Sequence, residues 1–124
     1  MNKRNFPMID LISTVCDISD LEYQKRVWVR GEGPEVDCFI ETAEGFLSGY
    51  DGFKDFDTRY EEYGLTKEQF LVLKALRQKI YDYNGFDSDE EIINDPKWLE
   101  IVNFAKIVYK KLHRNSDKMP YDKD

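Results

Sequence analysis

Three carboxylates with helical spacing are the residues of this chain best arranged for chemistry. Asp37, Glu41 and Glu44 stand four and three positions apart, so an α-helix would carry all of them on one face. Paired carboxylates support acid–base catalysis where burial or close pairing separates their pKa values. A stripe of acids that faces water provides neither condition. We therefore expect no catalytic site and no enzymatic activity.

Metal and nucleotide sites are not indicated either. The only histidine, His113, lies among lysines, and the Glu-x-x-His pairs of helical di-iron sites are absent from the sequence. In the acidic segment 82–91, Gly85 is at the fourth position, whereas a calcium-binding EF-hand loop needs glycine at the sixth. The Gly-Glu-Gly turn at 31–33 lacks the third glycine of a dinucleotide-binding loop. We expect no cofactor and no metal.

Negative charge is concentrated in the second quarter of the chain. The formal net charge of the 124 residues is −7, and segment 31–57 alone has eight carboxylates against one cation, Lys54. Such a concentration attracts a basic protein and speeds encounter with it, while it repels nucleic acids and anionic membranes. We therefore expect a cationic protein partner, no nucleic acid and no membrane. The eight acids are Glu32, Glu35, Asp37, Glu41, Glu44, Asp51, Asp55 and Asp57.

A solvated surface is the alternative explanation of the same acids. Acidic residues near a helix N-terminus favour the helix dipole, which accounts for Glu35 and Asp37. The dipole does not account for Glu41 and Glu44, because its effect fades beyond the first turn and their like charges repel across one turn. Charge alone leaves recognition and solvation equally open.

Aromatic residues gather in the same part of the sequence. Most of them have core spacing, but Tyr50, Phe53 and Phe56 surround a bend at Gly52, where packing is less assured. An exposed aromatic side chain ringed by carboxylates is typical of a protein–protein hot spot. Tyr50 and Phe53 are therefore candidate partner-binding residues, with a place in the core as the alternative.

Helix start signals divide the chain into the elements that would position these residues. Ser19 and Glu22 match a capping box, which predicts a helix through Trp28. Pro34 predicts the first turn of the acidic helix, whose apolar residues keep the helical period. The positions expected to face the core are Val36, Phe39, Ile40, Ala43, Phe46, Leu47 and Tyr50. Cys38, Thr42, Gly45 and Gly49 form a face of small residues, for which helix packing inside the domain is the favoured explanation.

The second half of the chain has equally regular signals. Thr66 and Gln69 form another capping box before the most regular helical run, Ser88 caps a short turn, and Pro96 begins the last helix. No strand pattern competes with these helices. With 41% hydrophobic and 15% aromatic residues, the chain has material for one core.

The fold prediction follows from these signals. We expect an all-α, compact single-domain bundle of five to seven helices at residues 1–114, followed by a polar, frayed tail at 115–124. The apolar stretch before Cys16 is short, has helical spacing and is interrupted by Asp10, so we interpret it as the first helix and not as an export signal. A cytoplasmic protein with reduced, buried thiols at Cys16 and Cys38 is then expected.

The first half of the chain contains several short motifs. They are Cys16-Asp17-Ile18, Tyr23-Gln24, Arg26-Val27-Trp28, Gly31-Glu32-Gly33-Pro34-Glu35-Val36-Asp37 and Phe39. This half resembles small bacterial immunity proteins, in particular those of contact-dependent growth inhibition systems. The resemblance implies a cytoplasmic protein that binds the toxic C-terminal domain of a delivered toxin, often a basic nuclease, and blocks its active site. Inhibitors of this kind are frequently acidic, in agreement with the charge argument.

The expected function is therefore stoichiometric occlusion of a cognate basic toxin domain. Its carboxylates would occupy sites where the toxin holds phosphate. The first expected contacts are Glu32, Glu35, Asp37, Glu41 and Glu44, followed by Asp51, Asp55 and Asp57. The alternative is a helical scaffold or adaptor subunit of a cytoplasmic complex without an inhibitory role, for which a large exposed apolar patch would be expected.

Overall fold

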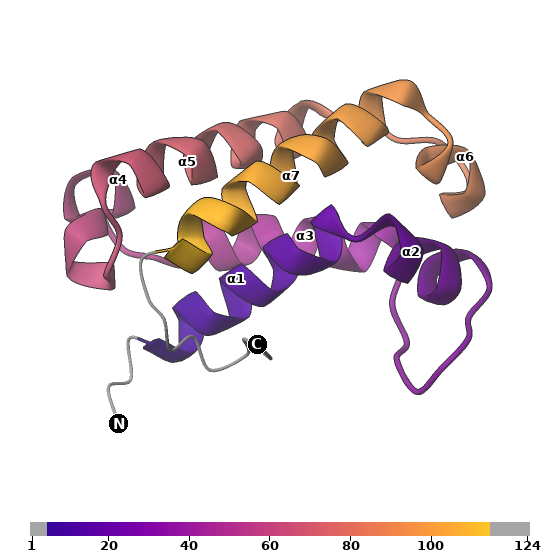
Figure 1. Cartoon of the computed structure of the whole chain (residues 1–124), viewed down its shortest axis with the longest axis horizontal. Coiled ribbons are helices and arrows are strands. Elements are labelled where there is room, and N and C mark those ends of the chain that lie inside the picture. The colour runs from indigo at the N-terminus through magenta and orange to yellow at the C-terminus, as the bar shows by residue number, and fades with distance from the viewer. Residues whose placement is uncertain (1–4, 115–124) are drawn as a thin grey trace.

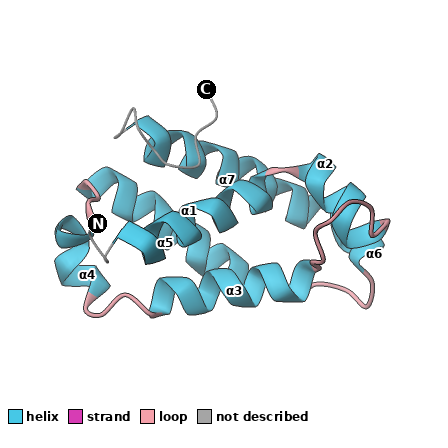
Figure 2. Cartoon of the chain, turned by 90° about the horizontal axis from the view of Figure 1, so that it is seen from below, coloured by secondary structure: helices cyan, strands magenta, loops and turns pink. Residues whose placement is uncertain are grey.

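Four helices form the body of an α-helical bundle. The computed structural model describes residues 5–114 of the chain, and the predicted polar tail 115–124 lies outside this range. The predicted all-α fold is confirmed, because the described residues form seven α-helices and no strand (Figures 1 and 2). The four helices of the body are α1 (Asn5–Ser19), α3 (Phe39–Asp51), α5 (Lys67–Asp82) and α7 (Pro96–Arg114).

Short helical segments connect these four helices. Two of them follow α1 without a loop, α2 (Leu21–Tyr23) and the π-helix η1 (Gln24–Val29). Between α3 and α5 lie α4 (Phe56–Arg59) and the 3-10 helix η2 (Tyr60–Tyr63), and α6 (Asp89–Ile93) precedes α7. Among the described residues, no helix is long and apolar enough to cross a membrane.

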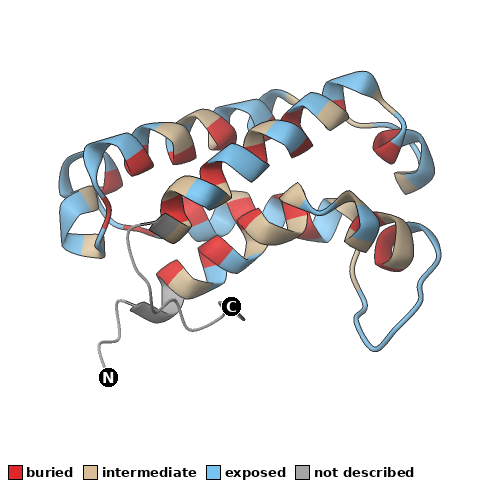
Figure 3. Cartoon of the chain, in the orientation of Figure 1, coloured by how far each residue is buried: buried red, intermediate tan, exposed pale blue. Residues whose placement is uncertain are grey.

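The core lies between the long helices. α7 packs against both α1 and α5, and α3 packs against the same two helices. The buried residues of each helix face inward, as Figure 3 shows, and the sides exposed to solvent carry the polar residues. Some side chains are entirely inaccessible, among them Val15, Phe46, Leu73 and Val108.

A buried glutamine fixes η1 against α7. The Gln24 side chain is 0% exposed, and its amide nitrogen donates hydrogen bonds to the backbone carbonyls of Asp17 and Ile18. Its amide oxygen accepts a hydrogen bond from the Trp98 indole at 2.9 Å. Because every polar atom of this side chain has a partner, the amide can be buried without a large desolvation penalty.

The predicted helix caps of the second half are confirmed. Thr66 and Gln69 form a reciprocal capping box at the start of α5, and the Ser88 hydroxyl accepts a hydrogen bond from the backbone N–H of Glu91. Such local signals need only neighbours in the sequence. They therefore place these two helix starts correctly without tertiary information.

The predicted capping box at Ser19 is wrong. α1 extends through Ser19, whose hydroxyl donates to the Cys16 carbonyl at 2.7 Å. Asp20 is the N-cap of the next helix, and its carboxylate accepts from the backbone N–H of Tyr23 at 3.0 Å. Aspartate caps as well as serine does, so the helix start shifts by one residue.

The acidic helix begins at Phe39, and the predicted start at Pro34 is wrong. Residues 31–38 form an extended loop, in which Gly31 and Gly33 have φ values of +64° and +95°. Two positions predicted for the core are consequently in solvent, since Val36 is 93% exposed and Ile40 is 59% exposed. Because Asp37 lies in this loop and not in the helix, it is not on the helical face that carries Glu41 and Glu44.

The two cysteines and the predicted face of small residues differ in how closely they are packed. Within the described residues neither Cys16 nor Cys38 forms a disulfide, and both side chains are half-buried where we expected burial. A Cβ atom on Gly49 would lie 3.5 Å from Leu11, so this glycine contributes to the contact between α3 and α1. A Cβ atom on Gly45, one turn earlier, would meet nothing within 4 Å, so the face is open at this position.

Candidate functional site

The eight acids predicted to bind a partner fall into three separate groups. The loop network consists of Glu32, Glu35 and Asp37 in the loop before α3. The α3 face consists of the exposed residues Ile40, Glu41, Glu44, Gly45 and Ser48. The aspartate cleft, at the other end of α3, contains Asp51, Asp55 and Asp57.

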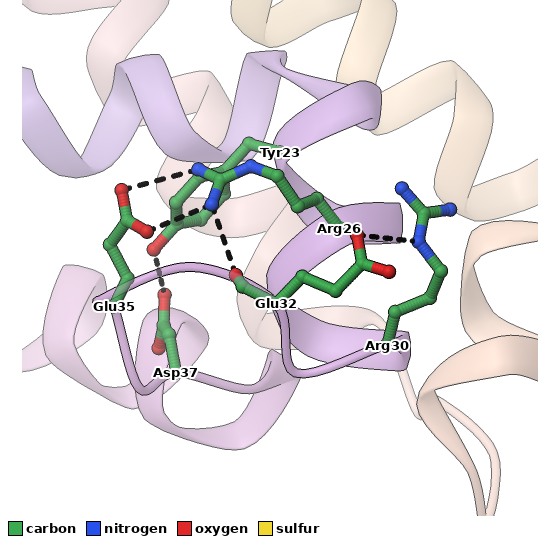
Figure 4. A network of polar contacts seen from close by, with 6 residues as sticks. All are labelled: Tyr23, Arg26, Arg30, Glu32, Glu35 and Asp37. Atoms are coloured by element: carbon green, nitrogen blue, oxygen red, sulfur yellow. Dashed lines mark hydrogen bonds and ion pairs between the residues drawn. The ribbon is translucent and has the colours of Figure 1, made fainter.

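Two acids of the loop network form ion pairs with arginines of η1 and the turn after it (Figure 4). Arg26 donates to both carboxylate oxygens of Glu35, at 2.9 and 3.2 Å, and to the backbone carbonyl of Glu32 at 3.0 Å. The Arg30 Nε lies 3.1 Å from the Glu32 carboxylate. The hydrogen bonds from Arg26 hold the pKa of Glu35 below its ordinary value. A Cβ atom on Gly33 would clash with the Arg26 guanidinium, so glycine allows this close approach.

Asp37 is a structural acceptor, and both of its carboxylate oxygens accept hydrogen bonds from within the chain. One carboxylate oxygen accepts hydrogen bonds from the hydroxyls of Tyr23 at 2.9 Å and Thr42 at 2.7 Å, and from the Trp28 indole at 3.3 Å. The other accepts from the backbone N–H of Cys38 at 2.8 Å. Burial, followed by the hydrogen bond to Asp37, raises the pKa of Tyr23, so its hydroxyl remains a donor.

The α3 face carries the acids that the fold leaves uncompensated. Glu41 and Glu44 are exposed, and neither makes an ion pair with another residue of the described range. The 59% exposed Ile40 lies one turn before Glu44 on the same side of the helix. Gly45 and Ser48 complete the face with small side chains. This surface combines negative charge, an apolar side chain and room for close approach.

The start of α3 also borders a second acidic segment. The backbone N–H of Phe39 donates to the Asp89 carboxylate at 3.2 Å, and a Cβ atom on Gly85 would lie 3.4 Å from the Phe39 ring. The loop before α6 therefore lies against the start of α3. It carries Phe86, which is 55% exposed. Sequence reasoning did not find this residue, because nothing in the spacing of the loop distinguishes an exposed aromatic side chain from a buried one.

The aspartate cleft contains acids that face cations of α4 and α5. Arg77 donates to both oxygens of Asp51, at 3.2 and 3.1 Å. Asp57 lies 3.7 Å from the Lys74 ammonium, and Asp55 lies 3.9 Å from the guanidinium of Arg59. The last two distances are too long for hydrogen bonds, so these two aspartates are held only loosely.

Tyr50 and Phe53 are buried, which corrects their prediction as exposed hot-spot residues. Tyr50 is 7% exposed and Phe53 is 6% exposed. Both rings pack on Phe56 with centroids 4.9 Å apart, and Phe56 in turn packs on Phe70 of α5 at 5.3 Å. The bend at Gly52 folds these aromatic residues inward. Their regular spacing of three residues was the signal that favoured the core.

Folding brings five cations against the acidic segment. All five lie outside segment 31–57 in the sequence, and each forms an ion pair with one of its acids. They are Arg26, Arg30, Arg59, Lys74 and Arg77. With these Lys and Arg charges counted, the net charge of the segment falls from −7 to −2. The predicted single acidic surface is therefore divided, and its uncompensated part is the α3 face.

No family model, no curated protein and no solved structure matches this chain. The resemblance of its first half to immunity proteins thus rests on the motifs quoted above.

Proposed function

We propose that this chain inhibits a cationic protein domain by binding it through the α3 face, as an immunity protein binds its toxin. The observation that carries this proposal is the pair of uncompensated carboxylates, Glu41 and Glu44, beside the exposed Ile40. Interfaces combine an apolar centre with a charged rim, and the α3 face has both. The resemblance of the first half to immunity proteins points in the same direction.

The mechanism is occlusion of a site that holds phosphate in the partner. Glu41 and Glu44 lie one helical turn apart and present carboxylate oxygens to two cationic side chains of that site. Ile40 and Val36 supply apolar area next to them, since both side chains are largely exposed. Gly45 permits close approach of the partner backbone. Opposite charges across the contact speed association more than they add affinity.

The loop network contributes less to this contact than the sequence suggests. Asp37 is excluded from the proposed surface because its hydrogen bonds are all internal. Glu32 and Glu35 remain about half exposed, at 56% and 42% of their side chains. Exposed ion pairs contribute about 0–1 kcal/mol, so a partner arginine can exchange with Arg26 or Arg30 at little cost. These two acids are secondary contacts in the proposal.

Charge reversal of the α3 face tests the proposal. The partner to use is the C-terminal domain of a large secreted toxin, if the gene immediately upstream encodes one. We expect Glu41→Lys with Glu44→Lys to weaken binding by about 10- to 100-fold, mainly through slower association at low salt. Biolayer interferometry at several salt concentrations measures this. Thermal unfolding of the variant should match that of the original chain.

A matched control separates the α3 face from overall charge. Glu61 and Glu100 are exposed and lie elsewhere, so Glu61→Lys with Glu100→Lys changes the net charge equally. This control should bind nearly as well as the original chain. Equal loss in both variants would show that only net charge matters, and unchanged affinity of the first variant would remove the α3 face from the interface.

A helical scaffold or adaptor role is the second candidate. The exposed apolar residues Leu71 and Tyr81 on α5 and Ile107 on α7 favour it, because each is at least 50% exposed. A scaffold subunit would assemble through such residues. Sedimentation velocity over a range of concentrations distinguishes the two: the inhibitor is expected to stay monomeric, whereas a scaffold would self-associate.

A further inference from the structure

A polar cleft of about 590 Å³ lies where α3 ends and α4 begins, with α5 as its far wall. Asp51, Asp55 and Asp57 line it from the side of α3 and α4, and Lys74 and Arg77 line it from α5. Arg59 of α4 lies 3.9 Å from Asp55 and is a third cation next to these three carboxylates. This is the aspartate cleft described above.

Tyr50 lines the cleft with a hydroxyl that has no hydrogen-bond partner among the described residues. The residue is 93% buried, as its exposed fraction of 7% shows. Burial, together with the charges of Asp57 and Asp51 and against the opposing charge of Arg77, raises the pKa of Tyr50 to about 12. All three of these charged residues line the cleft, so the hydroxyl lies within reach of its charges. A buried hydroxyl without a partner is rare and points to a missing ligand group or water.

The carboxylates of the cleft differ in how many acceptor sites remain open. Both oxygens of Asp51 receive hydrogen bonds from Arg77. Asp55 and Asp57 have their nearest cations at 3.9 and 3.7 Å, beyond hydrogen-bond length. The oxygens of Asp55 and Asp57 therefore keep open acceptor sites, and the Tyr50 hydroxyl next to them is buried without a partner among the described residues. An anion would be repelled by the two loosely held aspartates, so the cleft favours a cation.

We propose that the aspartate cleft binds the guanidinium group of an arginine side chain. A guanidinium carries five donors in one plane, so it can donate to two carboxylates and a hydroxyl together. It also packs on aromatic rings, and Tyr50 and Phe53 provide these in the cleft wall. As the source of this arginine we assign the cationic partner of the proposed function, and the assignment of the source rests on that function.

A titration with small probes tests the cleft without the partner. Nuclear magnetic resonance spectra of the whole chain are recorded with capped arginine, with capped citrulline as its neutral isostere, and with inorganic phosphate. We expect capped arginine alone to shift the amide signals of residues 50–58 and 74–78 in a saturable way. Shifts with phosphate in their place, equal shifts with citrulline, or no saturable shift with any probe would each overturn the proposal.

Variants of equal charge locate the binding groups. Asp55→Asn with Asp57→Asn should weaken arginine binding about tenfold or more, because two charge-assisted hydrogen bonds are lost. Glu61→Gln with Glu100→Gln, at exposed positions outside both proposed sites, changes the net charge equally and should leave arginine binding unchanged. Equal loss in both variants would overturn the assignment to the cleft.

Tyr50→Phe separates a ligand site from a structural water. If the hydroxyl serves a ligand, its removal weakens arginine binding and raises the melting temperature of the free protein, because an unpartnered buried polar group is removed. A lower melting temperature with unchanged arginine affinity would overturn the proposal, since it would show a hydroxyl satisfied by water.

The two proposals fail separately in these experiments. Arginine binding in the cleft without binding of the toxin domain would overturn the proposed function and leave the cleft site standing. Binding of the toxin domain without any arginine site would overturn the cleft site alone.

Discussion

The loop network and the α3 face are adjacent in the sequence and are both acidic, but the fold pairs the acids of the first with internal donors and leaves those of the second without ion pairs among the described residues. In the loop, every carboxylate of Glu32, Glu35 and Asp37 has a partner within the chain. On the α3 face, Glu41 and Glu44 have no ion pair among the described residues. Whether a carboxylate is available to a partner thus depends on the donors that the fold brings next to it. The local density of charge in the sequence does not reveal this.

The neighbouring helices explain the difference. The end of α2 and η1 turn Tyr23 and Arg26 toward the loop, where they supply hydroxyl and guanidinium donors (Figure 4). Trp28 of η1 supplies an indole donor. On the α3 face, the residues one turn away from each glutamate are small, apolar or acidic, so the helix offers no cation there. The acids of the loop hold it in place, whereas the acids of the face make no ion pair among the described residues.

The largest effect is expected when the internal acceptor is removed. Asp37→Ala leaves the donors of Tyr23, Thr42 and Trp28 in partly buried surroundings without their acceptor. Hydrogen bonds to charged groups are worth about 1.5–3 kcal/mol, so a loss of about 3 kcal/mol in the free energy of unfolding is expected. Urea denaturation followed by circular dichroism measures it. A loss below about 1 kcal/mol would contradict the structural role of Asp37.

A smaller, pH-dependent effect is expected at Asp17, which lies near the same network. Burial, followed by the charges of Asp37, Asp20 and Glu35, raises the pKa of Asp17 from 3.8 to about 6. Because the folded state then holds the proton more tightly than the unfolded state, stability falls as the pH rises from about 4 to 6 and stays reduced above it.

Asp17→Asn removes this charge and tests the sign. We expect the variant to be more stable than the original chain by about 1 kcal/mol at pH 7, a value discounted for partial solvent exposure, and equally stable below pH 4. Urea denaturation of both proteins at pH 4 and pH 7 measures the difference. Equal stability at pH 7 would show that the Asp17 carboxylate is well solvated.

Much of the fold was predictable because its signals are local. The capping box of Thr66 and Gln69 involves residues three positions apart, and the periodic apolar positions of α5 and α7 need only one helix each. The start of α3 was not predictable in this way. Asp37 binds Tyr23, fourteen positions earlier, and this contact holds the segment after Pro34 in an extended form. Tertiary hydrogen bonds there outweigh a local helix signal.

The candidate site was predictable only in part, for the same reason. The concentration of acids is a property of the sequence. Arg77, however, pairs with Asp51 across 26 positions, which is farther than any local sequence motif reaches. Ile40 was expected in the core because it fits the helical period, but it lies beside the inward face and is 59% exposed. The buried positions of α3 are Thr42, Ala43, Phe46 and Tyr50.

The smallest effect is expected on the α3 face, where the fold has nothing to lose. Glu41→Gln with Glu44→Gln removes a like-charge pair one turn apart, which costs a helix a few tenths of a kcal/mol. The variant should therefore be as stable as the original chain or more stable by about 0.2–0.5 kcal/mol, as measured by urea denaturation at low salt. A clear destabilisation would mean that these glutamates have partners in the fold, and the contrast with Asp37 would then fail. Because high salt screens such repulsion, the gain should also vanish at about 1 M salt, whereas the loss at Asp37, which arises from unpaired donors, should persist.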